Sequence, residues 1–151
     1  MSEKTKQTIV IDGTGHILGR LASHVATKLL EGAEVVVVNA EKMIVTGDKR
    51  AVINRYLRRA EMRVHLSHKW RPKHPRTPSR LFKRVVRGML PKNNRKGKEA
   101  LSRLKVFIGI PAEYMDSEKV IVKDAHIDGR GIPKKYVHLG EISKALGWKG
   151  E

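Results

Sequence analysis

The 151-residue chain has no cysteine, no long apolar run and no apolar segment at its start. Without cysteine, disulfides, thiolate nucleophiles and cysteine-based zinc sites are excluded. No stretch approaches the roughly 20 apolar residues of a membrane-spanning helix. The opening letters "MSEKTKQT" are polar and lack the apolar core of a secretory signal peptide. The sequence therefore predicts a cytoplasmic protein, and its length favours one domain over residues 1–151.

Acidic residues are missing from one internal stretch, Met62 to Lys98, which carries thirteen basic residues. The residues before this stretch have a net charge of +3 and those after it +1, so it accounts for most of the total of +17. A positive field of this size concentrates polyanions around the protein. Nucleic acid is therefore the expected partner. Because only 5% of the residues are aromatic, phosphate contacts and shape are expected to dominate over base stacking.

The apolar pattern predicts an α/β fold. "QTIVIDG" ends in a short apolar run typical of a buried strand, and residues 18–30 place apolar side chains at helical spacing. "AEVVVVNA" is a continuous β-branched run, which favours a strand covered on both faces of a parallel sheet. Strand, helix and strand within about 35 residues form a βαβ unit. A helix over "KRAVINRYLRRA", a short helix over "KEALSRL", a strand over "KVFIGIP" and a last helix around Leu139, Ile142 and Leu146 are also expected, and "MIVTG" is either a short strand or a turn. In the first of these, the inner face is predicted to hold Ile53, Tyr56, Leu57 and Ala60.

The acid-free stretch divides into an arm and a helix. Prolines and histidines between Met62 and Pro78 predict an extended, exposed arm, in which Trp70 either stacks on a base or anchors the arm. "SRLFKRVVRGML" predicts an amphipathic helix. Its apolar side consists of Leu81, Phe82, Val85, Val86, Met89 and Leu90, and its opposite side presents Arg80, Lys83, Arg84 and Arg87. "KNNRKG" is predicted to be a basic turn after Pro91.

A glycine cluster, "GTGHILGR", offers a competing hypothesis of a nucleotide-binding enzyme. Gly13, Gly15 and Gly19 lie between a strand and a helix, and Glu41 follows at the distance of a ribose-binding acid. The dinucleotide fingerprint, however, needs its third glycine where this chain has Leu18. An ordinary glycine-rich turn is therefore favoured, and we expect no cofactor.

Other site chemistries find little support in the sequence. His65, His68 and His74 lie among lysines and arginines, whose charge opposes a divalent cation, so no metal site is expected. No pair of carboxylates forms a recognisable acid–base couple, so no catalytic residue is expected. A nucleic-acid-binding regulator that acts on its own is a second alternative to be weighed.

Three blocks of sequence resemble one known family. "VIDGTGHILGRLAS", "VVNAEKMIVTGDK" and "RGMLPKNNRKGKEALSRLKVFIGIP" occur in the order and spacing of the ribosomal protein L13 family of the large subunit, and "KYVHLGEISKALGWK" is similar to its archaeal branch. The resemblance implies a three-layer α/β/α fold with a mainly parallel, Rossmann-like sheet. It also implies a non-catalytic protein that binds large-subunit ribosomal RNA beside neighbouring ribosomal proteins and supports subunit assembly and translation.

The predicted RNA-binding residues come from two sources. The resemblance implies His16, Arg20, Arg87, Gly88, Met89, Lys92, Arg95 and Lys96. The charge pattern adds Lys69, Arg71, Lys73, His74, Arg76, Arg80, Lys83 and Arg84. We therefore expect an RNA-facing arm and helix over residues 62–98 and a C-terminal extension over residues 112–151.

Overall fold

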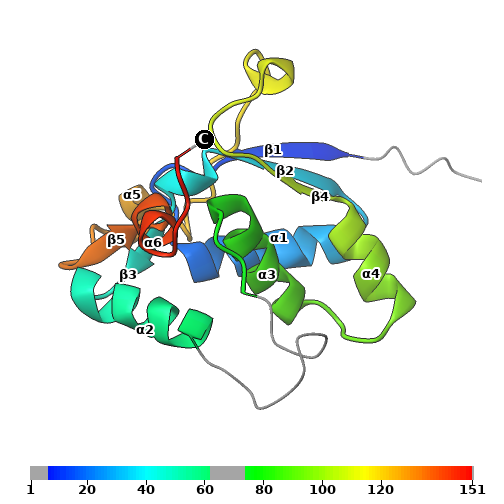
Figure 1. The fold of residues 1–151 in the computed structure, drawn as a ribbon. Helices are drawn as coiled ribbons and strands as arrows, with labels where there is room; N and C mark the ends of the chain where they lie inside the picture. The colour runs from blue at the N-terminus through cyan, green and yellow to red at the C-terminus, as the bar shows by residue number, and fades with distance from the viewer. Residues whose placement is uncertain (1–6, 62–73, 151) are drawn as a thin grey trace, which may run out of the picture.

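The computed structural model describes residues 7–61 and 74–150, and a parallel three-stranded sheet lies at its centre (Figure 1). The strand order is β1 (Thr8–Asp12), β2 (Glu34–Val38) and β4 (Leu104–Val106). Both neighbouring pairs are parallel, with Val10 opposite Val36 and Val36 opposite Lys105. The four valines of β2 are buried on both faces of the sheet, as a continuous β-branched run predicts.

Helices cover one face of this sheet. Figure 1 shows α1 (Leu18–Leu30), α3 (Pro78–Met89) and α4 (Arg95–Ser102) on the same side of the strands. Leu21, Val25 and Leu29 of α1 have no exposed surface. The helix ends where Gly32, at a φ of 97°, turns the chain toward β2. The predicted βαβ unit and the α/β class are confirmed.

The segment after β4 covers the opposite face of the sheet. Val10, Val36 and Val38 form a small apolar cluster there with Phe107 and Tyr114. Tyr114 ends the short 3₁₀ helix η3 (Ala112–Tyr114), and its ring centroid lies 5.8 Å from that of Phe107. The sheet is thus enclosed between a helical layer and this segment, which agrees with the predicted layered architecture.

The C-terminal part packs beside the sheet rather than extending away from it. β5 (Tyr136–His138) pairs antiparallel with β3 (Ile44–Thr46). α6 (Leu139–Ala145) packs against η1 (Ala40–Lys42) and α2 (Lys49–Glu61), and the short α5 (Ile127–Arg130) precedes β5. Leu139 and Ile142 are fully buried, which confirms the predicted docking of the last helix.

Three local predictions are wrong at single positions. In α2 the buried residue is Val52 and Ala60 is exposed, because this helix packs on α6 and β5 and its last turn, residues 58–61, is exposed. At the end of α3, Leu90 turns into the core in an extended conformation and leaves Met89 43% exposed. α4 begins at Arg95, inside the predicted basic turn, because the Asn94 side chain accepts a hydrogen bond from the Lys96 N–H at 3.2 Å.

Candidate nucleic-acid interface

The amphipathic helix α3 carries a row of four exposed cations. Thr77 precedes it in an extended conformation and Pro78 occupies its first turn, where a missing N–H costs nothing. Phe82 and Val86 have no exposed surface and fix the rotation of the helix on α1. The opposite side therefore presents a row that consists of Arg80, Lys83, Arg84 and Arg87. Both predicted faces of this helix are confirmed apart from Met89.

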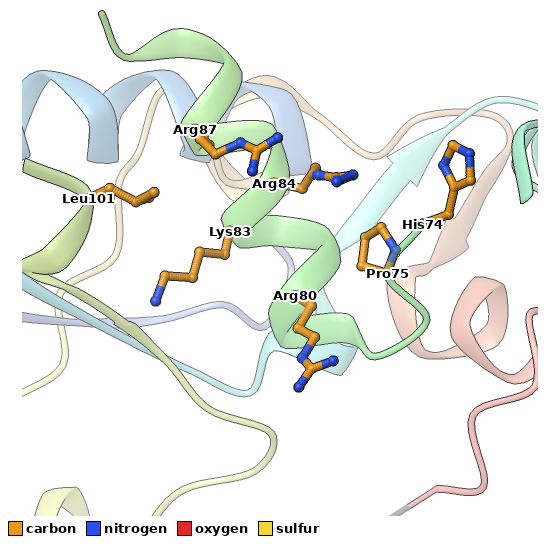
Figure 2. Close-up of a pocket in the computed structure, with 7 residues that line it drawn as sticks. All are labelled: His74, Pro75, Arg80, Lys83, Arg84, Arg87 and Leu101. Atoms are coloured by element: carbon orange, nitrogen blue, oxygen red, sulfur yellow. The ribbon is translucent and has the colours of Figure 1, made fainter. Parts of the chain in front are cut away.

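The cation row lines a shallow hollow of about 310 Å³. His74 and Pro75 border it on one side, and Leu101 of α4 borders it on the other (Figure 2). Figure 2 shows Lys83 on the side of Leu101, and Arg84 directed toward Pro75 and His74. None of the described residues that line this hollow is acidic. The hollow therefore offers four positive charges to an anion.

A second hollow, of about 420 Å³, continues the first beyond the end of α3. The two share Arg87 and Leu101, and the second adds Lys92 and Lys98. Its shape depends on Gly97, where a Cβ atom would lie 2.0 Å from the carbonyl oxygen of Pro91. We call the two hollows together the cationic trough, whose charged residues are Arg80, Lys83, Arg84, Arg87, Lys92 and Lys98.

Several other predicted residues are neighbours of the trough residues in the sequence, and most of them are exposed. Arg76, Gly88, Met89 and Lys96 are exposed, and His74 is half-buried at the border of the first hollow. Arg95 is exposed too, but its Nε donates to Glu99 Oε1 at 2.9 Å, so part of its charge is already compensated. Lys69, Arg71 and Lys73, together with His65, His68, Trp70 and most of the predicted arm, lie outside the described residues.

Lys98 lines the trough but is missing from the predicted set. It lies within the acid-free stretch, so the charge pattern contained the signal for it. Its position at the trough depends on the close approach of Gly97 to Pro91, which brings the start of α4 against the end of α3.

Arg20 lies on a different surface. It is exposed on α1 and lines a separate hollow of about 280 Å³ with Ser23, His24, Thr27 and the segment that contains Asp124. Burial and the charge of Lys28 lower the pKa of His24 below its usual value. This hollow holds polar groups of both signs, so it is a weaker anion site than the trough.

His16 cannot touch RNA in this structure, because the residue has no exposed surface. Its Nε2 accepts a hydrogen bond from the Val122 N–H at 3.0 Å, and its ring meets the His126 ring edge-on at 4.9 Å between centroids. Burial, followed by the neighbouring His126, lowers the pKa of His16 to about 4. The residue therefore joins two distant segments of the chain as a neutral side chain, and the prediction of a direct RNA contact is set aside for it.

The glycine turn is occupied by the protein itself. The N–H of Ile17, at the start of α1, donates to the Ala125 carbonyl at 2.8 Å. At Gly15, with a φ of 74°, a Cβ atom would lie 2.7 Å from His126 Nε2. Glu41, the candidate ribose-binding acid, instead accepts a hydrogen bond from the Gly109 N–H at 3.0 Å. These contacts occupy the space in the glycine turn that a dinucleotide would need. They also engage the Glu41 carboxylate that would bind its ribose.

Within residues 7–61 and 74–150, no group of three or more His, Asp or Glu side chains is arranged to hold a metal ion. No helix there has the length and apolar character needed to cross a membrane.

Comparison with known proteins identifies one family. The ribosomal protein L13 family matches residues 6–113. The large ribosomal subunit protein uL13 of Aeropyrum pernix is 51% identical over 143 residues, which cover 94% of this chain and 91% of that protein. The uL13 proteins of Archaeoglobus fulgidus and Pyrobaculum islandicum are 46% and 50% identical and cover 93% and 89% of this chain, with 88% and 76% of their own lengths aligned.

Proposed function

Because this chain belongs to the ribosomal protein L13 family and is a structural constituent of the large ribosomal subunit rather than an enzyme, we propose that its cationic trough binds the phosphate backbone of large-subunit ribosomal RNA. The curated relatives are named as large-subunit proteins over most of this chain's length. The proposal assigns the RNA-binding role to a particular surface of the molecule.

The observation that carries the proposal is the absence of acidic side chains from the described lining of both hollows, where six cations line the trough. Arginine guanidinium groups suit bidentate contacts to phosphate, whereas lysines act as point charges. The row on α3 is positioned by buried Phe82 and Val86. The cations therefore need little rearrangement before they meet a phosphate backbone.

The remaining predicted residues extend this surface. Arg76, Gly88, Met89, Arg95 and Lys96 are proposed as contacts beside the trough, and Lys69, Arg71 and Lys73 as contacts of the arm. Arg20 is proposed as a second, separate contact on α1. In this proposal the whole chain acts as one domain in the cytoplasm, beside neighbouring large-subunit proteins, and supports assembly and translation.

Sedimentation of a cell extract in moderate salt tests the proposal. We expect the protein to travel with the large subunit and to be released as salt is raised, because phosphate contacts are lost with increasing ionic strength. A protein that remains in the light fractions at moderate salt would support the alternative of a regulator that acts off the ribosome. Mixing purified protein with deproteinised large-subunit RNA then tests direct binding.

A further inference from the structure

Beside the cationic trough lies a smaller hollow of about 120 Å³, between α2, α3 and the residue that follows α6. Leu81 and Val85 of α3 and Leu146 after α6 form its apolar lining. Tyr56 of α2 and Pro75 add two flat side chains to that lining. These apolar side chains suit contact with a flat apolar group.

This hollow shares His74, Pro75 and Arg84 with the first hollow of the trough. Arg84 lines both the small hollow and the first hollow of the trough, and Arg59 lies at the small hollow with its guanidinium 5.8 Å from the centre of the Tyr56 ring. A polyanion that follows the row from Arg80 to Arg87 therefore passes the opening of an apolar hollow. In RNA, each sugar of the sugar–phosphate backbone carries a nucleobase, which has apolar faces and a polar edge.

We propose that this hollow binds one unpaired nucleobase of the ribosomal RNA whose backbone lies in the trough. The inference rests on the function proposed above and adds a base-binding site to its phosphate-binding surface. The volume suits a single base and is too small for a base pair. Tyr56 and Pro75 supply surfaces for the face of the base, and Arg59 and Arg84 supply donors for its edge or its phosphate.

An apolar side chain from a neighbouring protein is the other chemistry that such a hollow could take. The charge around it favours RNA, because Arg59 and Arg84 lie at its lining and no described residue that lines it is acidic. A protein partner would need an acidic group to match Arg59, whereas an RNA strand brings a phosphate with every base.

The test fills the hollow without changing the charge of the protein. Ala60, an exposed alanine of α2, contributes to the lining, and Ala51, an exposed alanine of the same helix, does not. Ala60→Phe is therefore the test variant and Ala51→Phe its matched control. Both are compared with the unaltered protein for binding to deproteinised large-subunit RNA and to a fully paired RNA duplex, after thermal unfolding shows that each variant is folded.

We expect Ala60→Phe to weaken binding to the large-subunit RNA by roughly 5- to 150-fold, the range expected for one lost stacking contact. Its salt dependence should stay unchanged, because no phosphate contact is removed. The paired duplex, which offers no unpaired base, should bind both proteins alike, and Ala51→Phe should behave as the unaltered protein with both RNAs. Ultraviolet irradiation of the unaltered complex should also link RNA to the peptide that contains Tyr56 or to the one that contains His74, independently of any variant.

The outcomes separate this inference from the proposed function. Failure of the unaltered protein to bind large-subunit RNA would overturn the proposed function itself. Salt-dependent binding that is equally strong in Ala60→Phe, without a cross-link at the hollow, would overturn the base-binding site alone. Normal RNA binding by Ala60→Phe combined with poor incorporation into subunits would mean that a protein side chain occupies the hollow, and would also overturn the inference.

Discussion

Repulsion between the like charges in the cation row of α3 should lower the free energy of unfolding of the isolated protein. Arg80, Lys83, Arg84 and Arg87 stand three or four residues apart, which places like charges side by side in four pairs on one exposed face. Each such pair on a helix costs about 0.2–0.5 kcal/mol at low salt. Replacing Arg80, Lys83 and Arg87 by Gln removes all four pairs and keeps good helix formers. Arg84 stays because it has a further interaction within the chain. We expect the free energy of unfolding to rise by about 1–2 kcal/mol in low-salt urea titrations.

The same variant should have a lower affinity for RNA, although its free energy of unfolding is higher. Three lost phosphate contacts flatten the slope of log affinity against log salt by about 2–3 units. A fourfold rise in salt should therefore weaken the unaltered protein roughly 15- to 65-fold more than the variant. The control variant replaces Lys105, Lys123 and Lys134 by Gln, which lowers the net charge equally outside the trough. An unchanged slope in the α3 variant, or an equal change in the control, would refute a local phosphate-binding role for this face.

Two further predictions concern stability. Gly97→Ala should lower the free energy of unfolding by about 1–3 kcal/mol, because its Cβ would meet the Pro91 carbonyl oxygen at 2.0 Å. Gly88→Ala, with no atom within 4 Å of the added Cβ, should instead raise it by about 0.5–1 kcal/mol, as thermal or urea unfolding of the pair will show. The pKa of buried His16 is about 4, below its value of 6.5 in the unfolded chain. Between pH 6.5 and pH 4 the unfolded chain therefore binds more protons than the folded protein, and the free energy of unfolding falls as the pH is lowered. Urea titrations from about pH 7 to pH 5 should show about 2 kcal/mol of this loss, and His16→Gln should remove that part of the pH dependence.

The sequence predicted those elements whose pattern is local. The four valines of β2 and the opposed faces of α3 depend on neighbours within a few residues, so period and composition were sufficient to locate them. The errors at Ala60 and Met89 occur near the ends of helices. There, the direction in which the chain leaves the helix decides which side chain is covered, and helical spacing carries no information about that direction.

The candidate site was predictable in its charge but not in its shape. An acid-free run identified the cations of α3 directly. The trough itself depends on Gly97 meeting Pro91, and the small hollow depends on Leu146, which lies more than 60 residues from Leu81 in the chain. Such contacts between distant segments leave no periodic signal in a single sequence.

His16 shows that a family resemblance can indicate an important position without indicating its role. The resemblance implied an RNA contact for this residue, which lies within the glycine turn. Its actual partners, Val122 and His126, lie beyond the part of the chain that matches the family, which ends at residue 113. The C-terminal segment therefore packs over the glycine turn and buries His16. Contacts that a nucleotide-binding fold of this shape leaves for a cofactor are here satisfied within the protein, so the glycine turn does not compete with the cationic trough, where we propose that RNA binds.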